Sequence, residues 1–336
     1  HRVADSAPGE RSEMLRRKKT MTCIAILDDY TNAAKNSADW AQLGDVQIDV
    51  VNTSLLATEE ARIAALAPYD IVVAMRERTA FPASTLNALP KLKLLVTTGL
   101  RNSSIDMAAA RARGVDVCGT QMTPYAAFEH SWALLMSLVK NIPAEHAAMT
   151  SGGWQAHTGV GLNGKTLGLV GLGKLGAKAA RAARAFEMNV IAWSPNLTEE
   201  RAAENGTTRV DKDTLFRQAD VVMVHMVLSD ATRGLVGARE FDVMKRSAYL
   251  INTSRGPLVD EGALIAALRG GQIAGAALDV YDVEPLPSDH PLRSLKNVVL
   301  TGHTGYVIQE MFEIAYGQAL EDILAWQDGT PQRLLN

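Results

Sequence analysis

Short apolar runs rich in Val, Ile and Leu alternate along the chain with longer alanine-rich segments that have a helical period. This alternation is typical of βαβ units, in which parallel strands lie side by side and helices cover both faces of the sheet. The runs form two series, separated by a helical stretch over 124–139 and a loop over 150–164 that contains five glycines. The pattern predicts an α/β protein with two doubly wound parallel sheets.

The first series predicts five strands and the second predicts six. The expected strands span 23–27, 46–51, 71–75, 94–97 and 115–118, and then 167–170, 190–193, 221–224, 248–251, 274–278 and 298–300. Helices are expected over 59–66, 105–113, 124–139, 177–186 and 308–327. Because the last helix follows the second series, we expect it to pack on the first sheet. Residues 21–122 and 304–336 would then form a flavodoxin-like domain into which a domain over 123–303 is inserted.

Composition excludes several classes of protein. The 336 residues are 47% apolar, which is enough for two cores, and 34 basic against 37 acidic residues give a formal net charge of -3. This balance argues against binding to nucleic acid or to an anionic membrane. No apolar run approaches the ~20 residues needed to cross a bilayer, so we expect a soluble protein. Cys23 and Cys118 match no metal or redox spacing, which predicts no metal site and fits a cytoplasmic location.

The first twenty residues differ from the rest of the chain. They hold six basic and three acidic residues and no apolar periodicity, so the fold is expected to begin near Met21. We interpret residues 1–20 as a disordered extension or a remnant of cloning, rather than as a basic arm that binds a partner.

A glycine-rich loop follows the first strand of the second series and opens a helix. Its sequence is Gly171-Leu-Gly173-Lys-Leu-Gly176. The first glycine permits a tight turn, the second lets a pyrophosphate approach the backbone, and the third lets the helix pack closely on the strand. In this strand-loop-helix setting the motif predicts a Rossmann-like dinucleotide-binding domain.

The choice between NAD and NADP depends on the end of the next strand. An acidic residue about 20 positions beyond the glycines would bind the ribose hydroxyls of NAD, but the chain has Ser194 and Asn196 there. No arginine stands beside Ser194, and Arg201 is the nearest candidate for a 2'-phosphate. We expect NAD, with NADP not excluded.

Polar residues follow three further strands of the second series, at the sheet edge where ligands bind in open parallel sheets. They are Arg255, Asp279 with Glu284, and His303. A guanidinium can clamp a carboxylate, a histidine can exchange an alcohol proton, and a carboxylate can orient the imidazole. Each residue alone could be a surface or turn residue. Their joint placement on the same sheet edge as the glycine loop favours hydride transfer to a 2-oxo acid.

These motifs together resemble the D-isomer-specific 2-hydroxyacid dehydrogenases, a group that includes phosphoglycerate, glycerate and D-lactate dehydrogenases. The resemblance covers the chain from about Met21. It implies that Arg255 binds the substrate carboxylate, that His303 is the general acid/base, and that Glu284 pairs with His303. It also implies a bilobed molecule with the active site in the cleft, and a homodimer formed largely through the cofactor domain.

The resemblance extends to the cofactor site, with some departures. The expected cofactor-binding residues are Gly171, Gly173, Lys174, Leu175, Gly176, Ser194, Asn196, His225, Met226, Thr232, Thr253, Asp279 and Gly305. Val227 and Gly302 stand where the family usually has proline. Glu129 and His130 also match a family pattern, and we expect both to be buried and structural.

The first domain carries the expected substrate-binding residues. They are Arg76, Gly99, Leu100 and Arg101, of which Arg101 replaces the second glycine of the family's loop. Arg101 could bind a second anionic group of the substrate or project into solvent. Arg76 could bind an anion or form a salt bridge with Glu77.

The sequence therefore predicts an NAD-dependent oxidoreductase that interconverts a small anionic 2-hydroxy acid and a 2-oxo acid. The alternative is a regulatory protein that senses the cofactor on the same fold. The Arg255, Glu284 and His303 set argues against a pure sensor, because a sensor needs no acid/base pair.

Overall fold

The computed structural model describes residues 21–336, so the expectation for residues 1–20 lies outside the described part. The chain divides into two compact units, one comprising the residues up to Met122 together with Gln309–Asn336, and the other Thr123–Ile308. The second boundary lies after residue 308, whereas the sequence pattern placed it after 303. The backbone amides of Thr304 and Gly305 donate to a carboxylate of the second unit, which keeps this turn with that unit.

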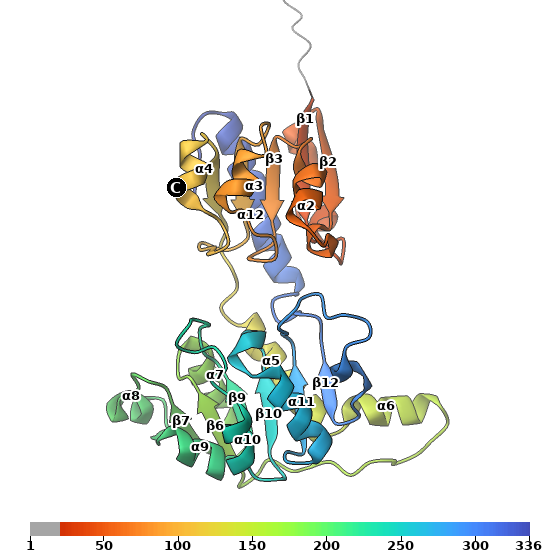
Figure 1. Cartoon of the computed structure of the whole chain (residues 1–336), viewed down its shortest axis with the longest axis vertical. Coiled ribbons are helices and arrows are strands. Elements are labelled where there is room, and N and C mark those ends of the chain that lie inside the picture. Colours follow the sequence, from red (N-terminus) through yellow and green to blue (C-terminus); the bar gives the residue numbers. More distant parts are fainter. Residues whose placement is uncertain (1–20) are drawn as a thin grey trace, which may run out of the picture. The chain divides into compact units, whose positions relative to one another are not determined.

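The first unit contains a five-stranded parallel sheet (Figure 1). Its strands are β1 (Thr22–Leu27), β2 (Val46–Val51), β3 (Ile71–Ala74), β4 (Leu94–Thr97) and β5 (Asp116–Gly119). The order β2-β1-β3-β4-β5 is the flavodoxin-like order, which confirms that prediction. Every residue of β3 and β4 is buried, as expected of central strands covered on both faces.

Short helices and one long helix cover this sheet. They are α1 (Ala34–Ser37), α2 (Glu59–Leu66), α3 (Ala83–Asn87), α4 (Met107–Ala112) and α12 (Gln309–Gln327), with 3-10 turns η1 (Trp40–Leu43) and η2 (Thr53–Leu55). Helix α12 packs on α1 and β4, so the last helix belongs to the first sheet, as its position after the second series indicated.

The second unit contains a seven-stranded parallel sheet in the order β12-β11-β10-β9-β6-β7-β8. Its strands are β6 (Thr166–Val170), β7 (Asn189–Trp193), β8 (Thr208–Arg209), β9 (Val221–Val224), β10 (Tyr249–Asn252), β11 (Gly275–Leu278) and β12 (Val298–Leu300). Its helices are α5 (Ala126–Val139), α6 (Ile142–Thr150), α7 (Lys174–Ala185), α8 (Glu199–Glu204), α9 (Lys212–Gln218), α10 (Ala238–Val243) and α11 (Glu261–Gly270), with 3-10 turns η3 (Gly256–Leu258) and η4 (Pro291–Ser294).

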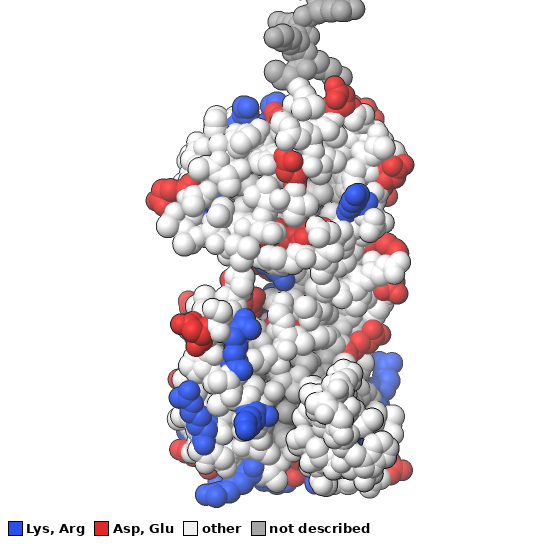
Figure 2. Space-filling view, turned by 90° about the vertical axis from the view of Figure 1, so that its right-hand side faces the viewer, with Lys and Arg blue, Asp and Glu red and all other residues white. Residues whose placement is uncertain are grey.

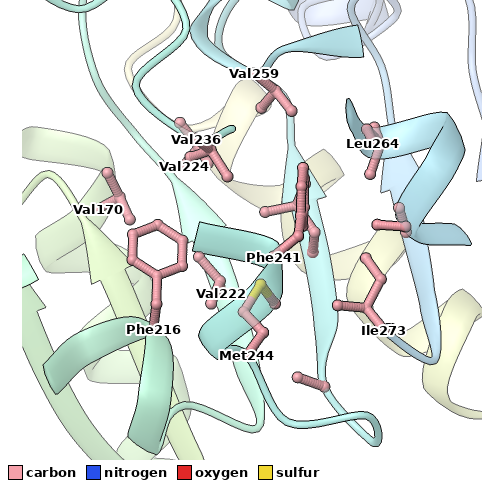
Figure 3. Close-up of a cluster of buried hydrophobic side chains, with 14 of the residues drawn as sticks. Val170, Phe216, Val222, Val224, Val236, Phe241, Met244, Val259, Leu264 and Ile273 are labelled. Atoms are coloured by element: carbon pink, nitrogen blue, oxygen red, sulfur yellow. The ribbon is translucent and has the colours of Figure 1, made fainter. Parts of the chain in front are cut away.

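The hydrophobic core of the second unit holds its strands in fixed positions. Figure 3 shows Phe216 of α9 and Phe241 of α10 beside Val222 and Val224 of β9, all at most 1% exposed. On the other face of the sheet, residues of α5 and α7 pack against β6 and β9. Burying an aromatic or branched side chain of this kind contributes about 1.5 to 3 kcal/mol. The packed strands thus form a rigid base for the loops at their carboxyl ends.

The charged surface is mixed. On the face drawn in Figure 2, Lys and Arg side chains occur among Asp and Glu side chains, and uncharged residues separate them. Among residues 21–336, no helix combines the length and the apolar character needed to cross a bilayer. Within the same residues, no group of three or more His, Cys, Asp or Glu side chains is arranged to hold a metal ion.

Candidate active site

Four parallel strands of the second unit bring the expected site segments to one edge of the sheet. Strands β6, β10, β11 and β12 end at Val170, Asn252, Leu278 and Leu300, and all run in the same direction. The glycine loop and the segments that carry Arg255, Asp279 and His303 therefore leave the sheet on the same side. In an open α/β sheet this edge is where ligands bind.

The three glycines of the loop meet three different steric conditions. Gly171 has φ +102°, and a Cβ there would lie 2.3 Å from the carbonyl oxygen of His225 and 3.1 Å from the sulfur of Met226. A Cβ on Gly176 would lie 2.3 Å from the carbonyl oxygen of Gly171. Gly173, at the start of α7, has no atom within 4 Å of the Cβ position. The first and third positions thus require glycine for packing, while the second leaves open space that suits a phosphate at a helix N-terminus.

The end of β7 contains no carboxylate for the ribose. Ser194 is half-buried and Asn196 is exposed. The Lys212 ammonium lies 5.9 Å from the centre of the Trp193 ring, and it pairs with Glu240 at 2.8 Å. This lysine is therefore already neutralised by a carboxylate.

The segment after β9 packs against the glycine loop. The backbone amide of His225 donates to the carbonyl of Val170 at 2.8 Å, and both ring nitrogens of His225 are buried without a hydrogen-bond partner. Burial lowers the pKa of His225 to about 4, so the imidazole is neutral at pH 7. The Thr232 hydroxyl donates to the carbonyl of Val227 at 2.7 Å and accepts the amide of Ser229 at 2.8 Å. Thr232 thus stabilises its own turn.

The backbone around Arg255 is fixed by a buried asparagine. The Asn252 side chain, 1% exposed, donates to the carbonyl of Arg255 at 2.9 Å and accepts the amide of Ser254 at 3.1 Å. The guanidinium of Arg255 donates to the carbonyl of Ser254 at 2.7 Å. A Cβ on Gly256 would lie 2.1 Å from the backbone of Tyr281, so only glycine fits there. Thr253, within the same turn, is half-buried. This turn therefore holds the guanidinium in a defined place.

His303 and Glu284 form a direct pair. Nδ1 of His303 lies 2.6 Å from Oε2 of Glu284, and the two side chains are 24% and 30% exposed. The other oxygen of Glu284 accepts the backbone amide of Tyr281 at 3.0 Å. The Tyr306 ring lies edge-on to the imidazole, with ring centres 6.0 Å apart. Because Glu284 engages Nδ1, Nε2 is the ring nitrogen that can exchange a proton with a bound molecule.

Asp279 anchors the loop that carries His303. Its carboxylate, 1% exposed, accepts the Thr301 hydroxyl at 2.6 Å and the backbone amides of Thr304 and Gly305 at 2.7 and 2.8 Å. Nε2 of His130 lies 3.3 Å from the same carboxylate. Burial alone would raise the pKa of Asp279, but the hydrogen bonds from His130, Thr301 and Thr304 outweigh it and hold the pKa below its usual value. Asp279 is therefore ionised and bonded to its own chain.

Sequence reasoning missed part of this network. Thr301 and Thr304 were not expected as site residues, although each lies within two positions of His303 in a stretch just past a strand. The expectation of a structural role for His130 agrees with its contacts to Asp279 and Thr301. The expectation that Glu129 is buried is wrong, because its side chain is exposed on α5.

The first unit places the expected substrate residues in two groups. A Cβ on Gly99 would lie 2.9 Å from the Arg76 guanidinium, so these two residues are in contact. Arg76 also pairs with Glu77 at 3.5 Å, which is the salt bridge considered from sequence. Leu100 is 51% exposed and the side chain of Arg101 is exposed.

The fold and the site define a dinucleotide-binding α/β protein with a dehydrogenase-type histidine and carboxylate pair. Residues 132–305 match the model of the D-isomer specific 2-hydroxyacid dehydrogenase, NAD binding domain. The chain belongs to the D-isomer specific 2-hydroxyacid dehydrogenase family. This match also confirms the prediction of NAD as the cofactor.

Known relatives agree with this assignment. The chain is 34% identical over 304 residues to a D-3-phosphoglycerate dehydrogenase of Archaeoglobus fulgidus, covering 89% of this chain and 57% of the relative, so it spans little more than half of that protein. It is 36% identical to a glyoxylate reductase of Aeropyrum pernix, covering 75% of this chain and 78% of the relative. The structure of a phosphoglycerate oxidoreductase of Vibrio cholerae O395 matches 92% of this chain and 100% of that chain, with a TM-score of 0.85 and 35% identity. These matches confirm the fold class expected from the sequence.

Proposed function

We propose that the protein interconverts a D-2-hydroxy acid and a 2-oxo acid in an NAD-dependent hydride transfer. The observation that carries the proposal is the 2.6 Å contact between Nδ1 of His303 and Glu284, at the same edge of the sheet as the glycine loop. A histidine held by a carboxylate can give and take a proton at its second nitrogen. Membership of the 2-hydroxyacid dehydrogenase family supports the same chemistry.

The residues of this chain take distinct roles in the proposed reaction. NAD, when bound, supplies the hydride acceptor or donor. In the oxidising direction His303 accepts the proton of the substrate hydroxyl, and in the reducing direction it donates a proton to the carbonyl oxygen. Glu284 fixes the imidazole and stabilises its positive charge. Arg255 binds the substrate carboxylate through its planar fork, which favours anionic acids over neutral alcohols.

Binding of the cofactor and of the substrate involves further residues. The open backbone at Gly173 and the N-terminus of α7 bind the pyrophosphate. In the first unit, the backbone of Gly99 and Leu100 contacts the substrate carboxylate. Arg76 contributes a positive charge beside that loop, and Glu77 neutralises part of it. The substrate class is therefore a small anionic 2-oxo or 2-hydroxy acid.

Steady-state kinetics test this function. The purified protein should oxidise NADH when it is given glyoxylate, hydroxypyruvate or a related 2-oxo acid, and NADH should be preferred to NADPH. Tight NADH binding without turnover of any acid in the panel would contradict the proposed enzymatic activity and favour the cofactor-sensing alternative. A preference for NADPH would contradict only the choice of cofactor and would leave the proposed reaction standing.

We further propose that the protein is a homodimer formed through the second unit. Helix α6 contains no buried residue, and Ile142, Met149 and Trp154 on α6 and the segment after it are 54%, 50% and 75% exposed. Apolar surface of this kind is stabilised when a second copy covers it. Light scattering should give the mass of two chains. Trp154→Ser with Met149→Ser should shift the mass towards one chain, while Leu55→Ser, at an exposed site in the first unit, should not.

A further inference from the structure

The end of the chain forms an extra strand-like segment on the outer side of β5. The residues Arg333–Asn336 run antiparallel to β5. The amide of Gly119 donates to the carbonyl of Arg333 at 3.0 Å, and the amide of Leu335 donates to the carbonyl of Val117 at 2.7 Å. Since β5 is the last strand of its sheet, this segment occupies hydrogen-bonding groups that an edge strand otherwise leaves unpaired.

Side chains fasten this segment at both of its ends. The Asn336 side chain accepts the amide of Val117 at 2.9 Å and donates to the carbonyl of Val115 at 2.9 Å. The Arg333 guanidinium lies 2.9 Å from the buried carboxylate of Asp322 on α12. The segment therefore has a fixed register against β5, and the position of Leu335 between the two anchors is defined.

Leu335 and the loop that contains Gly99 and Leu100 both pack against Gly119. A Cβ on Gly119 would lie 2.8 Å from a methyl carbon of Leu335, 2.7 Å from the carbonyl oxygen of Gly99 and 3.3 Å from the Cα of Leu100. The amide of Gly99 donates to the buried hydroxyl of Thr120 at 3.3 Å. The end of the chain and this loop thus both pack against the position where a side chain of residue 119 would begin.

We propose that Leu335 is a positioning residue for the Gly99–Leu100 loop and thereby sets the affinity for the 2-oxo acid. The inference rests on the proposed role of this loop in binding the substrate carboxylate. Leu335 is half-buried and contacts Gly119, and Gly119 contacts the loop backbone, so truncating Leu335 removes packing that holds the loop against β5. Backbone amides bind a carboxylate well only when their positions are fixed in advance.

The kinetic test compares two neighbouring leucines. Leu335→Ala should raise the KM for the 2-oxo acid about fivefold to tenfold, and should leave kcat and the KM for NADH within about twofold, because the cofactor is bound by the other unit. Leu334→Ala is the matched control, since Leu334 is 42% exposed and should leave all three constants unchanged. Leu335→Met keeps the volume and should restore the KM. An equal rise in both alanine variants, or no rise in either, would overturn the proposal.

A second measurement follows the mobility of the Gly99–Leu100 loop and does not depend on activity. Hydrogen exchange of a peptide that spans 96–102 should be faster in Leu335→Ala than in the wild-type protein, and unchanged in Leu334→Ala. If the alanine variant does not fold, Leu335→Val gives the same comparison with a smaller loss of packing. Unchanged exchange in the Leu335 variants overturns the positioning role, whereas a wild-type protein without turnover overturns the proposed function alone.

Discussion

Glu284 uses its two carboxylate oxygens for different partners, the imidazole of His303 and the backbone amide of Tyr281. The second bond fixes the carboxylate relative to the end of β11, so the first bond fixes the imidazole. In the proposed function, one nitrogen of His303 serves to orient the ring and the other exchanges the proton. The placement of both residues at one sheet edge could be predicted from sequence, because both follow strands of one parallel sheet, and the family resemblance implied their pairing.

Replacing Glu284 by glutamine tests this arrangement. Glu284→Gln keeps the shape of the side chain but removes the charge that stabilises the protonated imidazole, so kcat should fall about tenfold to a hundredfold. The control is Glu261→Gln, because Glu261 contacts another histidine of the same unit, His290, at 3.0 Å. Steady-state NADH oxidation measures both variants. Equal kcat values for Glu284→Gln and the wild-type protein would contradict the role of Glu284.

The hydrogen-bond network behind His303 could not be predicted from sequence. Asp279, Thr301 and His130 come from two strand ends and from α5, and only the packing of α5 against β11 and β12 brings them together. The family resemblance suggested a cofactor contact for Asp279. In the structure its oxygens accept hydrogen bonds from the loop of His303, and a contact with the cofactor stays a prediction.

Among the elements, the glycine loop and α7 combine two tightly packed glycines, Gly171 and Gly176, with an open position at Gly173. Helix α7 begins at Lys174, three residues before the start expected from its apolar period, because Lys174 and Leu175 form its first turn without contributing an apolar face. Its N-terminus therefore directly follows Gly173, which places free helical amides beside the open space at that glycine.

Gly173→Ala separates packing from phosphate binding. No atom lies within 4 Å of the Cβ position at Gly173, so the variant should fold with an unchanged thermal midpoint. The new methyl group occupies the space expected for the pyrophosphate, and the Kd for NADH should rise about tenfold or more. Fluorescence titration measures the Kd, and Gly270→Ala near the end of α11 is the control. Wild-type affinity in Gly173→Ala would contradict phosphate binding at this loop.

Most strands could be predicted to within one or two residues, because buried parallel strands are continuous apolar runs. Among the elements for which the sequence pattern predicted no range, two show why a pattern can fail. Strand β8 has two exposed, polar residues, and it forms only because its backbone pairs with β7. Helix α6 has no buried residue, so it lacks the apolar face by which sequence patterns reveal a helix.

At the scale of the whole molecule, the sequence pattern indicated two units and a final helix that belongs to the first sheet. It gave no sign of the C-terminal segment on β5, because four residues are too few to show a strand pattern. The contact between Leu335 and Gly119 depends on chain segments more than 200 residues apart, and such packing is not encoded in local periodicity.

The stability of the chain should depend on pH through Asp322. Burial raises the pKa of Asp322 to about 7, and the Arg333 guanidinium beside it only partly opposes this shift. The folded state thus binds a proton that the unfolded chain releases near pH 4, so this contribution to stability is present at low pH and is lost as the pH rises through 7.

Urea unfolding measures this contribution. Between pH 5 and pH 8 the free energy of unfolding of the wild-type protein should fall by roughly 1 to 3 kcal/mol relative to that of Asp322→Asn. The variant has no group that titrates at this position. Asp328→Asn, at an exposed position just after α12, should follow the wild-type protein at both pH values. Parallel pH dependence of the wild-type protein and Asp322→Asn would show that Asp322 is ionised throughout.

The most direct test of the account is the turnover of His303→Ala with NADH and the best 2-oxo acid of the panel. Loss of the group that exchanges the substrate proton should lower kcat about a hundredfold to ten-thousandfold, while the Kd for NADH stays within about twofold. His157→Ala, which removes a histidine paired with Glu145 elsewhere in the same unit, should keep wild-type kcat. A His303→Ala protein with the kcat of the wild type would contradict the assignment of His303 as the general acid/base.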